Sequence, residues 1–157
     1  GTVVDYMFIM AYDWHHSASE PGPVAPIGGV RATLQFAVER VPRQKILLGL
    51  PLYGYDWIIP YQPGMLATAR SNQEALLTAM RYQSPIQYSL ADESPFFRYT
   101  DALGNVHEVW FEDVRSMGQK MKLARQFQLA GVGAWQLTLG FAPGPWLLRK
   151  FFTVRKV

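Results

Sequence analysis

Two aromatic side chains and a carboxylate directly follow an apolar run near the start of the chain. The run from Val3 to Ala11 leads into Tyr12, Asp13 and Trp14. A buried parallel strand whose carboxyl end opens into a site has this pattern, because the strand is covered on both faces until its last residues. A phenol, a carboxylate and an indole at one rim would suit a sugar, whose ring has apolar C–H faces and polar hydroxyls at its equator.

Aromatic residues also end two later apolar runs, which begin at Ile46 and Gly131. These residues are Tyr53, Tyr55, Trp57 and Trp135. We expect Tyr12 and Asp13 to act directly on a ligand, and the other aromatic residues to bind it. For the residues of the second run, packing alone is an equal alternative. Met10 is expected to line the base of the same pocket.

Strands that alternate with helices would position these residues. The strands are expected at 3–13, 46–53 and 132–136, and the helices at 30–41, 113–128 and 146–152. Pro42 is expected to end the first helix and Gly131 the second. Strand, helix and strand in this order form βαβ units, which have parallel strands and a right-handed crossover.

A stretch of mixed structure separates the second and third of these strands. We expect a helix from Ser71 or Asn72 to about Tyr82, with Glu74 in its first turn. Short strands are predicted at 86–89, 96–100 and 106–111, with a turn at 104–105. The chain is therefore divided into a βαβ segment (1–57), a small α+β insertion (58–111) and a final αβα segment (112–157), all within one truncated domain.

Composition excludes several classes of function. The chain has 157 residues, of which 49% are hydrophobic and 17% charged, and this suits one folded domain. The net charge of +3 is small and no nucleic-acid-binding motif occurs, so we expect no nucleic-acid partner. The absence of cysteine excludes disulfides and thiol catalysis. No apolar run approaches the roughly 20 residues of a membrane span, and no metal or other cofactor is expected. The first residue is Gly1 and a strand follows almost at once, which indicates a segment of something longer.

Four motifs follow one another along the chain. They are Met10-Ala11-Tyr12-Asp13, Gly49-Leu50-Pro51-Leu52-Tyr53-Gly54, Trp110-Phe111-Glu112-Asp113 with Ser116, and Gly131-Val132-Gly133-Ala134-Trp135. Together they resemble glycoside hydrolase family 18, the chitinase-like (β/α)8 barrels. Segments 21–26, 94–99 and 107–113 are similar to the spore cortex-lytic and cell-wall N-acetylglucosaminidase branch. The resemblance implies an α/β fold that is the C-terminal portion of a TIM barrel, equivalent to its strands 6–8, with the insertion.

The resemblance also implies a reaction and a substrate. Family members cleave β-1,4-linked N-acetylglucosamine glycans, in peptidoglycan or chitin, by substrate-assisted retaining hydrolysis. Tyr12 would donate a hydrogen bond to the substrate acetamido oxygen, Asp13 would bind the acetamido region, and Trp135 would form the floor under the sugar. An extracellular, cell-wall or spore-associated location is implied in the same way.

One departure from the family limits this expectation. The family carries its catalytic acid in an Asp-x-x-Asp-x-Asp-x-Glu motif, which has no counterpart in this sequence. We therefore expect the chain alone to be inactive, and to pair with the missing N-terminal half of the barrel or to self-associate. A non-catalytic glycan-binding module of the same ancestry and a purely structural α/β domain are the alternatives.

Overall fold

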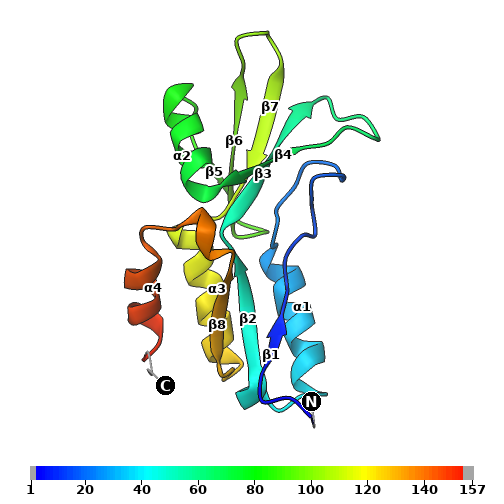
Figure 1. The fold of residues 1–157 in the computed structure, drawn as a ribbon. Coiled ribbons are helices and arrows are strands. Elements are labelled where there is room, and N and C mark those ends of the chain that lie inside the picture. Colours follow the sequence, from blue (N-terminus) through cyan, green and yellow to red (C-terminus); the bar gives the residue numbers. More distant parts are fainter. Residues whose placement is uncertain (1–2, 154–157) are drawn as a thin grey trace.

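The computed structural model describes residues 3–153 and contains two sheets, one above the other in Figure 1. The lower sheet is parallel, with strand order β1-β2-β8. Its strands are β1 (Met7–Ile9), β2 (Ile46–Pro51) and β8 (Gly131–Trp135). Three helices lie on one face of this sheet: α1 (Ile27–Val38), α3 (Val114–Gln126) and α4 (Gly144–Phe151). Short 3-10 helices occupy Arg43–Lys45 and Leu137–Leu139.

The upper sheet is antiparallel and has strand order β4-β3-β7-β6-β5. Its strands are β3 (Tyr53–Ile59), β4 (Thr68–Ser71), β5 (Gln87–Ser89), β6 (Ser94–Thr100) and β7 (Val106–Trp110), and α2 (Asn72–Arg81) packs beside it. β3 follows β2 after the single residue Leu52, so one nearly continuous stretch of chain joins the two sheets. This junction brings the ends of the parallel strands close to the insertion.

Helical periodicity explains how the helices pack on the parallel sheet. Val30, Leu34 and Ala37 of α1 recur at helical spacing and are all buried. Leu48 and Leu50 of β2 belong to the core that the helices cover. Burial of this apolar face stabilises the lower layer.

Several expected elements are confirmed and others are shifted. Helix α2 begins with Ser71 as its N-cap, and Asp113 caps α3. The first strand is much shorter than predicted, since pairing with β2 involves only Met7–Ile9, and the expectation for 3–13 was wrong. The predicted second strand, 46–53, is divided at Leu52 between the two sheets.

The predicted helix ends also need correction. Helix α1 spans 27–38 and ends at Val38, before Pro42. Helix α3 ends at Gln126, and the left-handed residue after it is Gln128 (φ 55°) rather than Gly131. Gly131 instead begins β8. Because the antiparallel sheet begins at Tyr53, we propose that the insertion begins there and not at residue 58.

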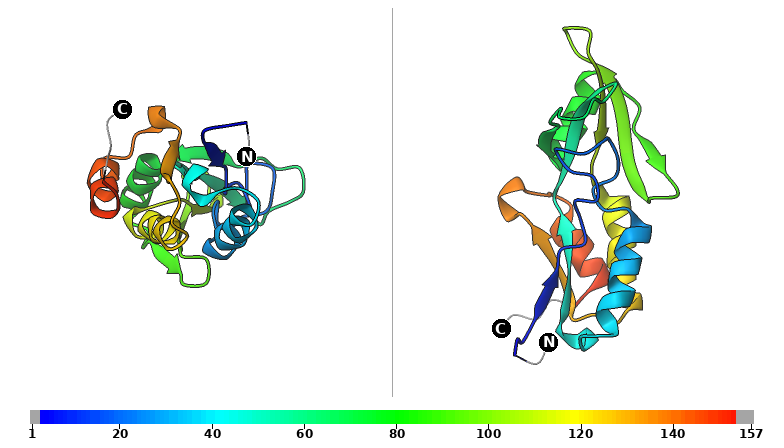
Figure 2. Two further views of the ribbon diagram at one scale, coloured as in Figure 1. Left: turned by 90° about the horizontal axis from the view of Figure 1, so that it is seen from below. Right: turned by 90° about the vertical axis from the view of Figure 1, so that its right-hand side faces the viewer.

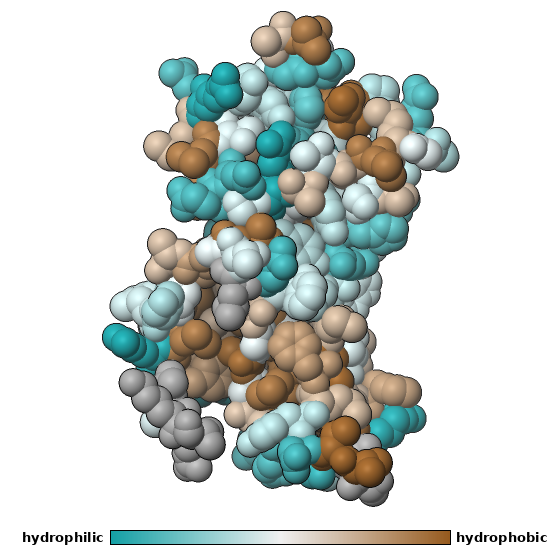
Figure 3. Space-filling model, in the orientation of Figure 1, coloured by the Kyte–Doolittle hydropathy of each residue, from teal (hydrophilic) through white to brown (hydrophobic). Residues whose placement is uncertain are grey.

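The parallel sheet has two open edges and one open face within the described range 3–153. β1 and β8 each pair with β2 alone. On the face away from the helices, Phe8 lies over Gly49 and Gly133, where an added Cβ would come within 2.6 and 2.4 Å of its ring. Tyr6 and Met10 are 63% and 69% exposed. Apolar side chains gather in the lower part of the molecule in Figure 3.

The isolated chain is therefore expected to self-associate or to need a further segment to cover this face. Unpaired parallel edges and an apolar surface favour association between chains. Light scattering over a range of concentrations should show a mass that rises with concentration. A monodisperse monomer at high concentration would contradict this expectation.

None of the helices between residues 3 and 153 is long and apolar enough to cross a membrane.

Candidate active site

A polar cavity of about 300 Å³ lies where the parallel sheet meets the insertion. Segments far apart in the sequence contribute to its wall. The lining residues are Asp13, Tyr53, Tyr55, Ala69, Arg70, Ser71, Glu74, Trp135, Gln136 and Leu139. Asp13, Tyr53, Tyr55 and Trp135 are thus brought together as residues that the sequence singled out.

Asp13 lies at the centre of a tyrosine cluster. Its Oδ1 accepts hydrogen bonds from the hydroxyls of Tyr53, at 2.7 Å, and Tyr55, at 3.2 Å. Its backbone has φ 62°, in the left-handed region that non-glycine residues enter at a cost. The Oδ2 atom has no hydrogen-bond partner in the part of the chain that the structure describes, so it can accept a hydrogen bond from a ligand.

Tyr12 lies beside this cluster, although it is not among the residues that line the cavity. Its ring meets that of Tyr53 edge-on, with centroids 6.2 Å apart. Its hydroxyl is buried and makes no hydrogen bond to any described residue. Burial, and then the negative charge of Asp13, raise the pKa of Tyr12 above its ordinary 10.0, so the hydroxyl keeps its proton as a donor at neutral pH.

Trp135 forms an exposed wall of the cavity at the end of β8. Its side chain is 54% exposed, and its peptide bond to Gln136 is cis. The backbone N–H of Leu52 donates to the Trp135 carbonyl at 2.7 Å, which ties the end of β8 to the junction between the two sheets. An exposed indole face beside polar groups is suited to the C–H face of a sugar.

The insertion contributes a rim that the sequence did not predict as part of the site. The Ser71 hydroxyl accepts from the backbone N–H of Glu74, while Glu74 Oε2 accepts from the backbone N–H of Ser71 at 2.7 Å. This capping box was visible as a helix start. Its place in the same cavity as Trp135 depends on how the two sheets join, which no local sequence pattern predicts.

Three predicted binding residues lie outside this cavity. Trp57 is 1% exposed, and its indole N–H donates to the Ser19 carbonyl at 2.8 Å, so it packs under the loop that follows Trp14. The Trp14 indole lies against Gly29 of α1, where an added Cβ would come within 2.6 Å of it. Met10 is exposed on the open side of the parallel sheet.

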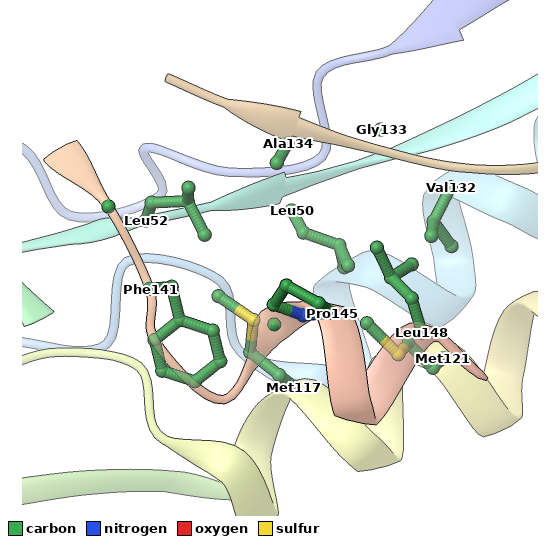
Figure 4. A pocket seen from close by; sticks show the side chains of 12 residues that line it. Leu50, Leu52, Met117, Met121, Val132, Gly133, Ala134, Phe141, Pro145 and Leu148 are labelled. Atoms are coloured by element: carbon green, nitrogen blue, oxygen red, sulfur yellow. The ribbon is translucent and has the colours of Figure 1, made fainter. Parts of the chain in front are cut away.

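A second cavity, of about 280 Å³, lies between the parallel sheet and helices α3 and α4 (Figure 4). Apolar side chains line it, among them Leu50, Met117, Phe141 and Leu148. It lacks the polar groups that would orient a sugar. The polar cavity is therefore the candidate site.

Raising the pH above 10 is expected to destabilise the tyrosine cluster. Burial raises the pKa of Tyr55 from 10.0 to about 12, with Asp13 adding to the effect, and the same two causes raise that of Tyr53. Above pH 10 these tyrosines keep their protons in the folded protein but lose them in the unfolded chain. Their contribution to folding stability is therefore complete below pH 10 and falls as the pH rises through 12. Urea denaturation at increasing pH, with tyrosinate absorbance recorded in parallel, tests this. Two tyrosines that ionise at 10 in the still folded protein would contradict it.

Known proteins are similar to this chain over most of its length. Residues 1–140 match the model of the family "Glycosyl hydrolases family 18". A Bacillus subtilis relative, "Putative sporulation-specific glycosylase YdhD", is 68% identical over 157 residues, which are 100% of this chain and 37% of the relative. The "Cortical fragment-lytic enzyme" of Bacillus subtilis is 44% identical over 149 residues, or 94% of this chain and 34% of that enzyme.

A solved structure shares the fold over nearly the whole chain. The Bacillus cereus spore cortex-lytic enzyme SleL superimposes with a TM-score of 0.96 at 39% identity, covering 99% of this chain and 37% of that one. The chain thus spans little more than a third of each of these three proteins. Since the family model matches most of the sequence, the chain belongs to the family 18 glycosyl hydrolases.

Proposed function

We propose that this chain forms the acetamido-binding part of a glycosidase that cleaves β-1,4-linked N-acetylglucosamine glycans. Membership of family 18 supports a glycan-cleaving enzyme. The names of the relatives, a sporulation-specific glycosylase and a cortical fragment-lytic enzyme, favour a spore-associated peptidoglycan over chitin. In this proposal the three parallel strands are equivalent to strands 6–8 of a (β/α)8 barrel.

Substrate-assisted hydrolysis requires a particular set of contacts. The acetamido oxygen of the substrate attacks the anomeric carbon while an acid protonates the departing glycosidic oxygen, and water then opens the cyclic intermediate with retention. The protein must hold the acetamido group in line and stabilise the positive charge that develops on it. Tyr12 would donate to the acetamido oxygen, Asp13 would accept from the acetamido N–H through Oδ2, and Trp135 would support the sugar ring.

The observation that carries this proposal is the Tyr12 hydroxyl. It is buried and without a hydrogen-bond partner among residues 3–153, beside a carboxylate that two other tyrosines hold in place. A buried hydroxyl usually has a partner. An acetamido oxygen would supply the missing acceptor.

The catalytic acid has to come from outside these 157 residues, because the family's acid motif is not in the sequence. A segment that completes the barrel against β1 and β8 would supply both the acid and the cover for the open face. We therefore propose that activity requires this segment, and that the chain alone gives negligible turnover.

A hybrid enzyme tests the proposal. This chain would replace the matching segment of the Bacillus subtilis cortical fragment-lytic enzyme, to which it is 44% identical. N-acetylglucosamine oligomers and cortex fragments are the substrates, and mass spectrometry identifies the products. We expect the hybrid to cleave and the isolated chain not to.

The unaltered enzyme serves as the positive control, and a cooperative unfolding transition shows that the hybrid is folded. Cleavage by the isolated chain, free of contaminating enzyme, would contradict the need for an outside acid. A folded hybrid that binds glycan without cleaving it would instead favour the non-catalytic binding module.

A further inference from the structure

A buried polar cluster lies between the starts of α2 and α3, and its member Asn72 directly follows Ser71 of the cavity wall. Lys120 Nζ donates to Glu112 Oε2 at 2.9 Å, and the Ser116 hydroxyl donates to the same oxygen at 2.6 Å. Lys120 and Glu112 are each 1% exposed, and Ser116 and Asn72 are 0% exposed. Lysine and glutamate are almost never this buried unless they are paired.

Asn72 links this cluster to the cavity wall. Its side-chain Oδ1 accepts from the backbone N–H of Glu112 at 3.0 Å. Its backbone N–H donates to the Leu52 carbonyl at 3.3 Å, and the Leu52 N–H in turn donates to the Trp135 carbonyl at 2.7 Å. A chain of hydrogen bonds thus runs from the buried ion pair to the wall of the sugar cavity.

The same residue also sets the position of the insertion rim. Asn72 is the first residue of α2, directly after Ser71, and Glu74 lies in the first turn of that helix. Ser71 and Glu74 line the same cavity as Trp135. A shift of Asn72 would therefore move the rim and release the junction that holds Trp135.

The cluster is not the arrangement that stability alone would favour. A buried ion pair is often no more stabilising than apolar side chains of similar volume. Two of its buried polar atoms, Asn72 Nδ2 and Glu112 Oε1, have no hydrogen-bond partner within the described residues, which adds a further cost. A cluster that carries such costs is more readily explained by the geometry it imposes.

We propose that Asn72 and the Glu112–Lys120 pair are positioning residues for the sugar cavity. They fix the distance between the insertion rim and the Trp135 wall, and so determine how tightly the sugar is held. This inference rests on the proposed function, because it concerns the same cavity.

The first test compares two asparagines of the insertion in the hybrid enzyme. Asn72→Ala is expected to raise KM for N-acetylglucosamine oligomers about tenfold, equivalent to roughly 1.4 kcal/mol of binding, with a much smaller change in kcat. Asn105→Ala is the matched control, since Asn105 holds Asp101 in the turn between β6 and β7 and does not line the cavity. Equal KM values for the two variants, measured where both are folded, would overturn the inference.

The second test replaces the buried ion pair by apolar side chains in a protein that stays folded. Glu112→Leu combined with Lys120→Met removes both charges together, so stability should be nearly retained. A positioning role predicts a raised KM and faster hydrogen exchange at the Asn72 amide, whereas a merely structural role predicts that neither changes. The exchange measurement does not depend on activity. Hydrogen exchange at the Asn72 amide that stays slow in this variant would overturn the inference. Absence of cleavage by the unaltered hybrid would overturn the proposed function alone.

Discussion

Replacing Tyr12 by phenylalanine in the hybrid enzyme is expected to lower kcat about 100- to 1000-fold, the usual effect of removing one donor to a developing charge. The hydroxyl would hold the acetamido oxygen at the moment when it attacks the anomeric carbon. Folding stability should stay the same or rise slightly, because the buried hydroxyl makes no hydrogen bond to the described residues. Steady-state kinetics and urea denaturation measure the two effects separately.

Tyr82→Phe is the matched control, since Tyr82 follows α2 and its ring stacks on that of Tyr99, and neither residue lines the cavity. We expect this variant to change neither kcat nor stability. A Tyr12→Phe enzyme that keeps full activity would exclude the proposed role of the hydroxyl. If the Tyr12→Phe enzyme loses activity only to the extent that it loses folding stability, Tyr12 has a packing role instead.

Local signals predicted many of the elements. Ser71 and Asp113 are capping residues whose side chains accept from the backbone N–H three residues on, and such contacts can be predicted from sequence. Strand lengths depend on the partner strand. The apolar run at 3–13 looks like one long strand, yet β2 pairs with only three of its residues. The change of sheet at Leu52 has no local signal, because it depends on bonds to Trp135 and Asn72.

In the candidate site, too, some residues could be predicted from local sequence and others depend on tertiary packing. Asp13, Tyr53 and Trp135 could be predicted because each follows an apolar run, and the ends of parallel strands meet at one edge. Alternation along β3 places Tyr53 and Tyr55 at the cavity, while Trp57 continues past it and is buried under a loop. The rim of Ser71 and Glu74 is brought to the site by tertiary packing.

Replacing Lys120 by methionine is expected to lower the free energy of unfolding by about 3–5 kcal/mol, the typical cost of removing one partner from a buried ion pair. Glu112 would keep its place with a single donor, the Ser116 hydroxyl. The charge of a carboxylate with so little compensation is poorly solvated in the interior. Lys122→Met is the control: Lys122 is exposed and, among residues 3–153, its side chain bonds only Gln119, so the change should stay within about 0.5 kcal/mol.

The pH dependence of this variant separates loss of the charge partner from loss of packing. Burial raises the pKa of Glu112 above its ordinary 4.5, and removing Lys120 takes away the attraction that opposes this effect. A raised pKa in the folded state gives stability that is complete below pH 4.5 and is lost as the pH rises. Urea denaturation should therefore show that Lys120→Met loses less unfolding free energy, relative to the unaltered protein, at acid pH than at neutral pH. An equal loss of unfolding free energy at both pH values would mean that Lys120 stabilises the fold through the packing of its methylene groups. The ion pair with Glu112 would then have no part in holding α3 in place.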